Sequence, residues 1–228
     1  MIFHGGPAYS SSIGWDLYVR FFLALGYAVL EPNVRGSIDL GRAYERADNR
    51  EKRADWLRDL ATVNTWTKAQ PWCDPERVAV WGASYGGYTT LMTLSRHPTI
   101  WRAGVDLFGV ADLRTFLCST MPTIRAGFVA EFGDLDRDGP LLDEFNPMRT
   151  VDRIAAPLFV YAGQTDPRVP RSESDAIVRA LRDRGVPVEY MVAEDEGHSV
   201  DHRENKIELL TRTARFLADA MAIPATDR

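Results

Sequence analysis

The chain has 228 residues, of which 45% are hydrophobic and 26% charged, and its net charge at pH 7 is −5. This length suits one large domain with a substantial core, and the acidic balance argues against nucleic acid as a partner. No apolar run approaches the about 20 residues of a membrane-spanning helix, so we expect no membrane association. The two cysteines are too few for a disulfide framework and favour free thiols in a cytoplasmic protein.

Short apolar runs alternate with helical patterns along most of the chain. The apolar runs predict strands at residues 27–30, 77–81, 103–108, 157–161 and 186–192. The helical patterns lie at residues 15–25, 54–69, 85–96, 172–184 and 205–221. This alternation is typical of an α/β fold, with a mostly parallel sheet and helices on both faces. We expect a single domain over residues 1–228.

Two segments depart from a simple strand–helix alternation. Residues 112–149 contain a helical segment and a Gly/Asp-rich loop, and we expect them to form an excursion over the active site at the top of the sheet. Between Glu45 and Asp59, acidic and basic residues alternate, which favours a solvated helix face.

The most specific motif is Gly82-Ala-Ser84-Tyr-Gly86, which fits G-x-S-x-G. An apolar strand precedes it and a helical pattern follows, the context of a nucleophile elbow. Glycine is needed on both sides of such a serine because strand and helix approach closely there. Ser84 is therefore the predicted nucleophile.

A serine hydroxyl needs a base, and a third group must orient that base. His198 follows the last predicted strand, where a loop would present it on the catalytic edge. Asp166 follows the strand before, although Asp106, Asp112 and Asp195 are rival acids. The order Ser84, Asp166, His198 is that of an α/β-hydrolase triad and favours Asp166.

The oxyanion of an acyl-transfer intermediate needs two hydrogen-bond donors. One is expected from the N–H of Tyr85, directly after the nucleophile. The second normally comes from a Gly-rich loop after an earlier strand, and His4-Gly5-Gly6-Pro7 fits that position.

Several motifs occur in a characteristic order over nearly the whole chain: HGGP (4–7), GYAVLEPNVRGS (26–37), GASYGGY (82–88), GVAD (109–112), DPRVP (166–170) and DEGH (195–198). In combination they resemble the catalytic domain of the prolyl oligopeptidase family, in particular its acylaminoacyl-peptidase and dipeptidyl-peptidase-like branch. The resemblance implies an α/β-hydrolase fold and a serine peptidase, such as an aminopeptidase, acting on short peptides or on aminoacyl and acylaminoacyl amides.

The resemblance also implies residue roles. Arg168 corresponds to an arginine that binds a substrate carbonyl. The pocket for the residue before the scissile bond corresponds to Tyr85, Val110, Leu113, Phe116 and Val169. Two positions depart from the family pattern. His4 replaces a tyrosine that supports the oxyanion, so that the Gly6 N–H is expected to act instead. Leu113 replaces a tryptophan, which argues against a proline-selective pocket.

Family members also carry a β-propeller, which these 228 residues cannot encode, and strands that precede HGGP. We therefore expect an N-terminally truncated hydrolase domain, with an upstream propeller segment in the full-length protein. The strand ending at Phe3 is expected to be interior, between the strands at 27–30 and 77–81.

No motif predicts a metal or other cofactor, and a homo-oligomer is compatible with the sequence. Two alternatives to a peptidase stay open. A carboxylesterase could use the same triad, or the chain could be an inactive fragment of a longer peptidase.

Overall fold

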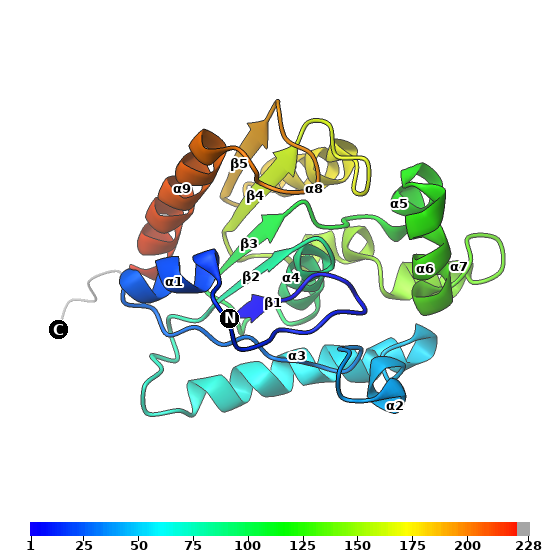
Figure 1. Cartoon of the computed structure of the whole chain (residues 1–228), viewed down its shortest axis with the longest axis horizontal. Coiled ribbons are helices and arrows are strands. Elements are labelled where there is room, and N and C mark those ends of the chain that lie inside the picture. Colours follow the sequence, from blue (N-terminus) through cyan, green and yellow to red (C-terminus); the bar gives the residue numbers. More distant parts are fainter. Residues whose placement is uncertain (223–228) are drawn as a thin grey trace.

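Within residues 1–222, which the computed structural model describes, five parallel strands form one sheet in the order β1-β2-β3-β4-β5 (Figure 1). The strands are β1 (Ile2–Phe3), β2 (Ala79–Ala83), β3 (Ala103–Leu107), β4 (Leu158–Gly163) and β5 (Val188–Ala193). Because the strands are parallel, their carboxyl ends lie along one edge, where loops of the α/β class present functional side chains.

Helices cover both faces of the sheet (Figure 1). Apolar residues of α1 (Leu17–Ala24) and α9 (Arg203–Met221) pack in one core layer with Val105 of β3 and Phe159 of β4. The opposite layer is formed with α3 (Arg53–Lys68), α4 (Tyr85–Arg96) and α8 (Arg171–Asp183). The α/β-hydrolase architecture predicted from the sequence is thus confirmed.

Short helices complete the described chain: α2 (Arg42–Glu45), α5 (Leu113–Ser119), α6 (Pro122–Phe132) and α7 (Gly139–Glu144). Three 3₁₀ turns accompany them: η1 (Arg50–Lys52), η2 (Pro147–Arg149) and η3 (Val151–Arg153). Helices α5, α6 and α7 follow the carboxyl end of β3 and lie together at one side of the molecule (Figure 1).

The strand predicted at residues 27–30 is wrong. The segment lies next to β1, but it makes a single backbone hydrogen bond there, from the N–H of Ile2 to the carbonyl of Leu30 at 2.8 Å. A ladder requires repeated pairing, and β1 offers only two residues. The other four predicted strands are present as β2 to β5, with ends that differ by a few residues.

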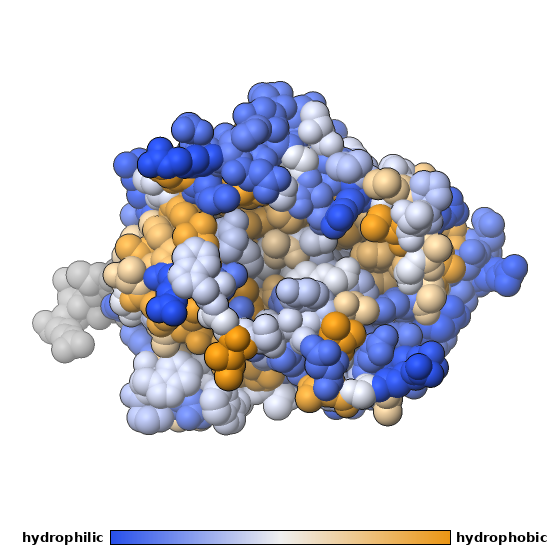
Figure 2. All heavy atoms as spheres, viewed as in Figure 1, coloured by the Kyte–Doolittle hydropathy of each residue, from blue (hydrophilic) through white to orange (hydrophobic). Residues whose placement is uncertain are grey.

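The outer surface is uneven in character. Hydrophilic side chains dominate over α8 and apolar ones gather over α1 (Figure 2), where Leu23 remains half exposed. Among residues 1–222, none of the helices combines the length and apolar character needed to cross a bilayer.

One ionisable side chain of the sheet is buried without a charged partner. Asp106 on β3 is fully buried, and its Oδ1 accepts a hydrogen bond from the N–H of Gly109 at 2.9 Å. Its Oδ2 has no hydrogen-bond partner among the described residues. Burial raises the pKa of Asp106 to about 7, because the charged carboxylate loses its water shell.

We predict that Asp106 makes folding stability fall as pH rises. Its pKa is raised in the folded state, so between about 4 and about 7 the folded protein holds a proton that the unfolded chain has released. Asp106→Asn keeps the acceptor for Gly109 and removes the ionisation. Denaturant unfolding gives the free energy of unfolding at pH 5 and pH 8. Relative to the wild type, that of the variant should be higher at pH 8 than at pH 5 by a few kcal/mol. An equal difference at both pH values would contradict this assignment.

Candidate active site

Ser84 lies at a sharp turn between strand and helix. β2 ends at Ala83, α4 begins at Tyr85, and Ser84 between them has φ 59° and ψ −118°. A positive φ is rare for a residue with a side chain, and such conformations cost on the order of 1–3 kcal/mol. The serine is therefore held by its surroundings in the geometry of a nucleophile elbow.

The glycines on either side of Ser84 permit a very close approach of main chains. A Cβ added to Gly82 would lie 2.0 Å from the carbonyl oxygen of Gly86. A Cβ added to Gly86 would lie 2.1 Å from the carbonyl oxygen of Phe3, the last residue of β1. The predicted need for glycine at both positions is confirmed, because any side chain would overlap the facing backbone.

His198 lies between Ser84 and Asp166. Its Nε2 is 2.8 Å from the hydroxyl of Ser84, and its Nδ1 is 2.6 Å from Oδ2 of Asp166. The other carboxylate oxygen of Asp166 accepts hydrogen bonds from the N–H groups of Arg168 and Val169. The Asp166 side chain is fully buried. With Nδ1–H donated to Asp166, Nε2 is free to accept the serine proton.

The rival acids have other partners. Asp112 caps α5 through the N–H of Arg114 at 2.8 Å. Asp195 contacts His202 at 2.8 Å, and Asp106 lies beneath α4 against Gly109. Of the four candidates, Asp166 alone is in contact with His198.

The loop HGGP lies against the elbow. A Cβ on Gly5 would be 3.8 Å from Cβ of Ser84, which shows how closely the loop approaches the nucleophile. His4 contacts the hydroxyl of Ser37 at 2.8 Å, and burial lowers the pKa of its imidazole. Among residues 1–222, neither the N–H of Gly6 nor that of Tyr85 donates a hydrogen bond within the protein. Both predicted oxyanion donors are thus without a hydrogen-bond partner among the described residues, and the N–H of Tyr85 directly follows Ser84.

The predicted pocket residues are part of the large core layer on the α4 side, and they line neither of the two cavities described below. Each is at most 4% exposed: Tyr85, Val110, Leu113, Phe116 and Val169. Glu173 of α8 is also buried and accepts the N–H groups of Ala111 and Asp112 at 3.1 and 2.7 Å. Glu173 therefore fixes the turn that carries the pocket segment.

Arg168 differs from these apolar residues because it is exposed. Its backbone carbonyl accepts a hydrogen bond from the hydroxyl of Thr120 at 2.7 Å, which connects the Asp166 loop to the end of α5. Among the described residues its guanidinium makes no hydrogen bond or ion pair, so it is available to a substrate.

The segment with alternating charge is solvated as predicted at Arg46, Glu51, Lys52 and Arg58, which are exposed. The prediction is wrong for Asp48 and Arg53, which are both fully buried and form an ion pair at 3.2 Å. Their partners come from distant positions: Tyr85 of α4 and Glu131 of α6. A pattern of local charges contains no information about these distant partners.

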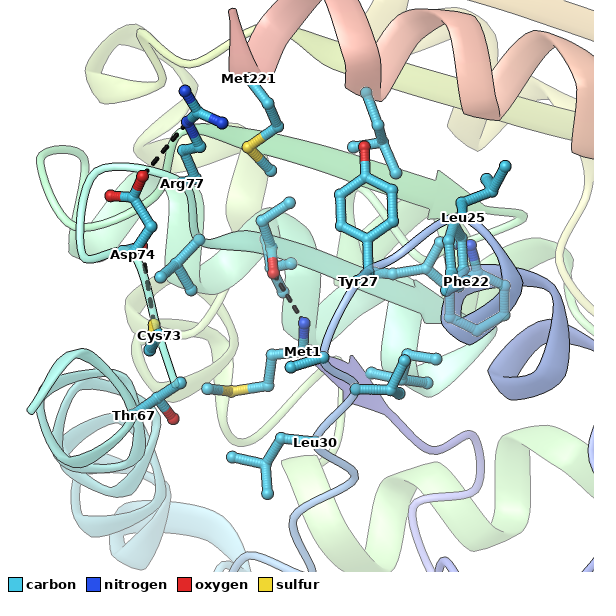
Figure 3. A pocket seen from close by; sticks show the side chains of 18 of the residues that line it. Met1, Phe22, Leu25, Tyr27, Leu30, Thr67, Cys73, Asp74, Arg77 and Met221 are labelled. Carbon is cyan, nitrogen blue, oxygen red and sulfur yellow. Dashed lines mark hydrogen bonds and ion pairs between the residues drawn. The ribbon is translucent and has the colours of Figure 1, made fainter. Parts of the chain in front are cut away.

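Two cavities differ in their position relative to Ser84. The larger, of about 510 Å³, lies at the amino ends of the strands, where the ammonium of Met1 donates to the carbonyl of Ala79 at 2.8 Å (Figure 3). A smaller cavity of about 320 Å³ lies between the HGGP loop and residues 9–18, and it reaches Ala83 but is not lined by Ser84 or His198. The larger cavity is therefore not the candidate active site.

Residues 13–223 match the Prolyl oligopeptidase family. The chain is 36% identical over 227 residues to dipeptidyl aminopeptidase BIII of Pseudoxanthomonas mexicana, covering 97% of this chain and 33% of the relative. It is 28% identical over 208 residues to the human acylamino-acid-releasing enzyme, covering 88% and 28%. The structure of a Mycobacterium tuberculosis puromycin-hydrolyzing peptidase superposes with a TM-score of 0.91 at 28% identity, covering 97% and 34%. The chain thus spans about a third of the length of these relatives.

The glycine packing at the elbow generates a stability prediction. Gly82→Ala should destabilise the fold by about 3 kcal/mol, because its Cβ would overlap the carbonyl of Gly86 in a main-chain contact that cannot relax cheaply. Gly127→Ala is the matched control, since nothing lies within 4 Å of a Cβ in the middle of α6. Replacing that helical glycine should stabilise by about 0.5–1 kcal/mol. Denaturant unfolding measures both, and similar changes in the two variants would contradict the packing argument.

Proposed function

This chain belongs to the prolyl oligopeptidase family, and from that membership we propose that it hydrolyses short peptides or acylaminoacyl amides through an acyl-enzyme on Ser84. The observation that carries the proposal is the continuous contact from Ser84 through His198 to Asp166. Dipeptidyl aminopeptidase, acylamino-acid-releasing and puromycin-hydrolyzing relatives support an amide as the scissile bond.

In the first half-reaction, the Oγ of Ser84 attacks the substrate carbonyl while its proton passes to Nε2 of His198. Asp166 accepts Nδ1–H and stabilises the imidazolium that forms. The carbonyl oxygen becomes an oxyanion, which the N–H groups of Tyr85 and Gly6 stabilise. The C–N bond then breaks, and Nε2–H of His198 protonates the departing amine.

In the second half-reaction, water gives a proton to Nε2 of His198 and attacks the acyl carbonyl. Collapse of the second intermediate releases the carboxylic acid and returns the proton to Ser84. Strain in the Ser84 backbone serves both steps, because it keeps the hydroxyl projected toward the substrate rather than toward the helix.

Substrate placement follows from the groups around Ser84. By the resemblance to the family, Val110, Leu113 and Phe116 contact the side chain on the acyl side of the scissile bond. Each is at most 1% exposed, so a substrate must displace part of the packing that covers them. The exposed guanidinium of Arg168 binds a carbonyl of the acyl chain.

We further propose that a β-propeller accompanies this domain in the intact protein, because the relatives are about three times as long. A cytoplasmic location fits the two free thiols, Cys73 and Cys118.

A fluorophosphonate probe tests whether the site is assembled. The probe should label the wild-type chain, because phosphonylation requires an activated serine and an oxyanion site. Ser84→Ala should abolish the labelling completely. Ser172→Ala, which removes an exposed serine of α8, is the matched control and should label like the wild type. A wild-type chain that does not label, or a Ser84→Ala variant that does, would refute the proposal.

Two pairs of substrates then separate a peptidase from an esterase. We expect turnover of an aminoacyl or acetylaminoacyl p-nitroanilide as well as of a p-nitrophenyl ester, because His198 can protonate a departing amine. The acetylated and free anilides report whether a free amino terminus is required. Hydrolysis of the ester with no detectable anilide cleavage, at a protein concentration fixed by probe labelling, would identify a carboxylesterase.

A further inference from the structure

A buried ionic cluster lies directly behind the residue that follows the nucleophile. The guanidinium of Arg53 donates to the phenol oxygen of Tyr85 at 2.6 Å. The Tyr85 hydroxyl in turn donates to Oδ2 of Asp48 at 3.1 Å. Arg53, Asp48 and Tyr85 are all at most 4% exposed. The phenol oxygen is thus fixed between a cation and an anion in the interior.

Aromatic rings close the cluster off from water. The Arg53 guanidinium lies 3.9 Å from the ring centroid of Phe132 and 5.3 Å from that of Trp56. The ring of Tyr85 packs against Trp56 and Phe132 at centroid distances of 6.0 and 6.2 Å. Cation–π contacts offset part of the cost of burying arginine.

Burying such a cluster costs desolvation free energy that apolar side chains would not cost. Buried ion pairs often contribute no more stability than apolar residues of the same volume, since desolvation opposes the attraction. Here the geometry is also incomplete, because Oδ1 of Asp48 and Nε of Arg53 have no hydrogen-bond partner among the described residues. Stability alone therefore gives a poor account of why charge is placed behind Tyr85.

The position of Tyr85 suggests a second role. Its main-chain N–H is a proposed oxyanion donor, and the peptide that carries this N–H joins it to the strained Ser84. A strained residue persists only when its surroundings over-determine it. The Tyr85 side chain is fixed at its phenol oxygen by Arg53 and Asp48. The Ser84–Tyr85 peptide is therefore constrained by the Ser84 backbone on one side and by the Tyr85 side chain on the other.

We propose that Arg53 and Asp48 are positioning residues for catalysis, which act through the phenol of Tyr85 to hold the Ser84–Tyr85 peptide where its N–H stabilises the oxyanion. The inference rests on the proposed function, because it assumes that Ser84 is the nucleophile. It adds two residues that touch neither the substrate nor the catalytic triad.

The rate of fluorophosphonate labelling tests this role separately from folding. Misfolding lowers the fraction of protein that finally labels, whereas a displaced oxyanion donor lowers the second-order rate constant of the fraction that is folded. Tyr85→Phe and Arg53→Met should each slow labelling about tenfold, less than the 10²–10³ for losing a donor outright. Arg53→Lys should recover part of the rate, because it keeps a cation near the phenol. Anilide hydrolysis should lose kcat with little change in KM.

Glu51→Gln is the matched control. Glu51 lies two residues before Arg53 but is 76% exposed and pairs with Arg50 rather than with Arg53 or Tyr85, so its variant should label at the wild-type rate. The double variant Arg53→Met/Tyr85→Phe should be no slower than Tyr85→Phe alone, because both changes break the same contact. This non-additivity is the signature of an effect that passes through the phenol.

Three outcomes would overturn the inference. Unchanged labelling rates in Tyr85→Phe and Arg53→Met would show that the cluster has no influence on the oxyanion site. Multiplied effects in the double variant would show that Arg53 acts by another route. A wild-type chain that fails to label would refute the proposed function and this inference with it, whereas normal wild-type labelling with unaffected variants refutes the inference alone.

Discussion

The main-chain contact between β1, β2 and α4 is the constraint on which the candidate site depends. Gly82 of β2 meets Gly86 of α4, and Gly86 in turn meets the carbonyl of Phe3. Because the HGGP loop starts directly after Phe3, the contact that allows the elbow also brings that loop against Ser84. The nucleophile and both proposed oxyanion donors are therefore positioned by one three-way packing of backbones, and a side chain at either glycine would disturb all of them together.

The polar groups around this packing follow a common rule: each is fixed by a partner from another element. Asp166 accepts two backbone N–H groups as well as the imidazole of His198. Glu173 accepts the N–H groups that open the pocket segment, and Arg53 binds the phenol of Tyr85. Buried charges require such partners, because an isolated ion would lose its hydration without compensation. Asp106 has the N–H of Gly109 but no charged partner, and burial raises its pKa to about 7.

Much of the fold and site could be predicted from the sequence, because apolar runs mark the strands locally and the order of parallel strands determines which loops meet. The apolar runs of β2 to β5 form strands of a parallel sheet whose two faces are both covered by helices. Parallel strands also bring their carboxyl ends to one edge, so the order Ser84, Asp166, His198 was enough to place three distant residues together. The failures arose where the outcome depended on distant partners. Residues 27–30 have strand-like composition but a two-residue neighbour, and Asp48 and Arg53 are buried by contacts with Tyr85 and Glu131, at positions 37 and 78 residues away in the chain.

The residues proposed for bond cleavage and those proposed for substrate selection lie in different parts of the structure. This separation explains how relatives named for different substrates can share one catalytic arrangement. The groups proposed for bond cleavage follow the carboxyl ends of β1, β2, β4 and β5, and are held by backbone packing and buried hydrogen bonds. These constraints leave little room for variation. The groups proposed for substrate selection include Arg168, whose side chain is exposed, and Leu113, which differs from the tryptophan of the dipeptidyl-peptidase pattern. Differences among dipeptidyl aminopeptidases and acylamino-acid-releasing enzymes can therefore arise at such positions, and in the two thirds of the relatives' length that this chain does not span, without any change to the chemistry at Ser84.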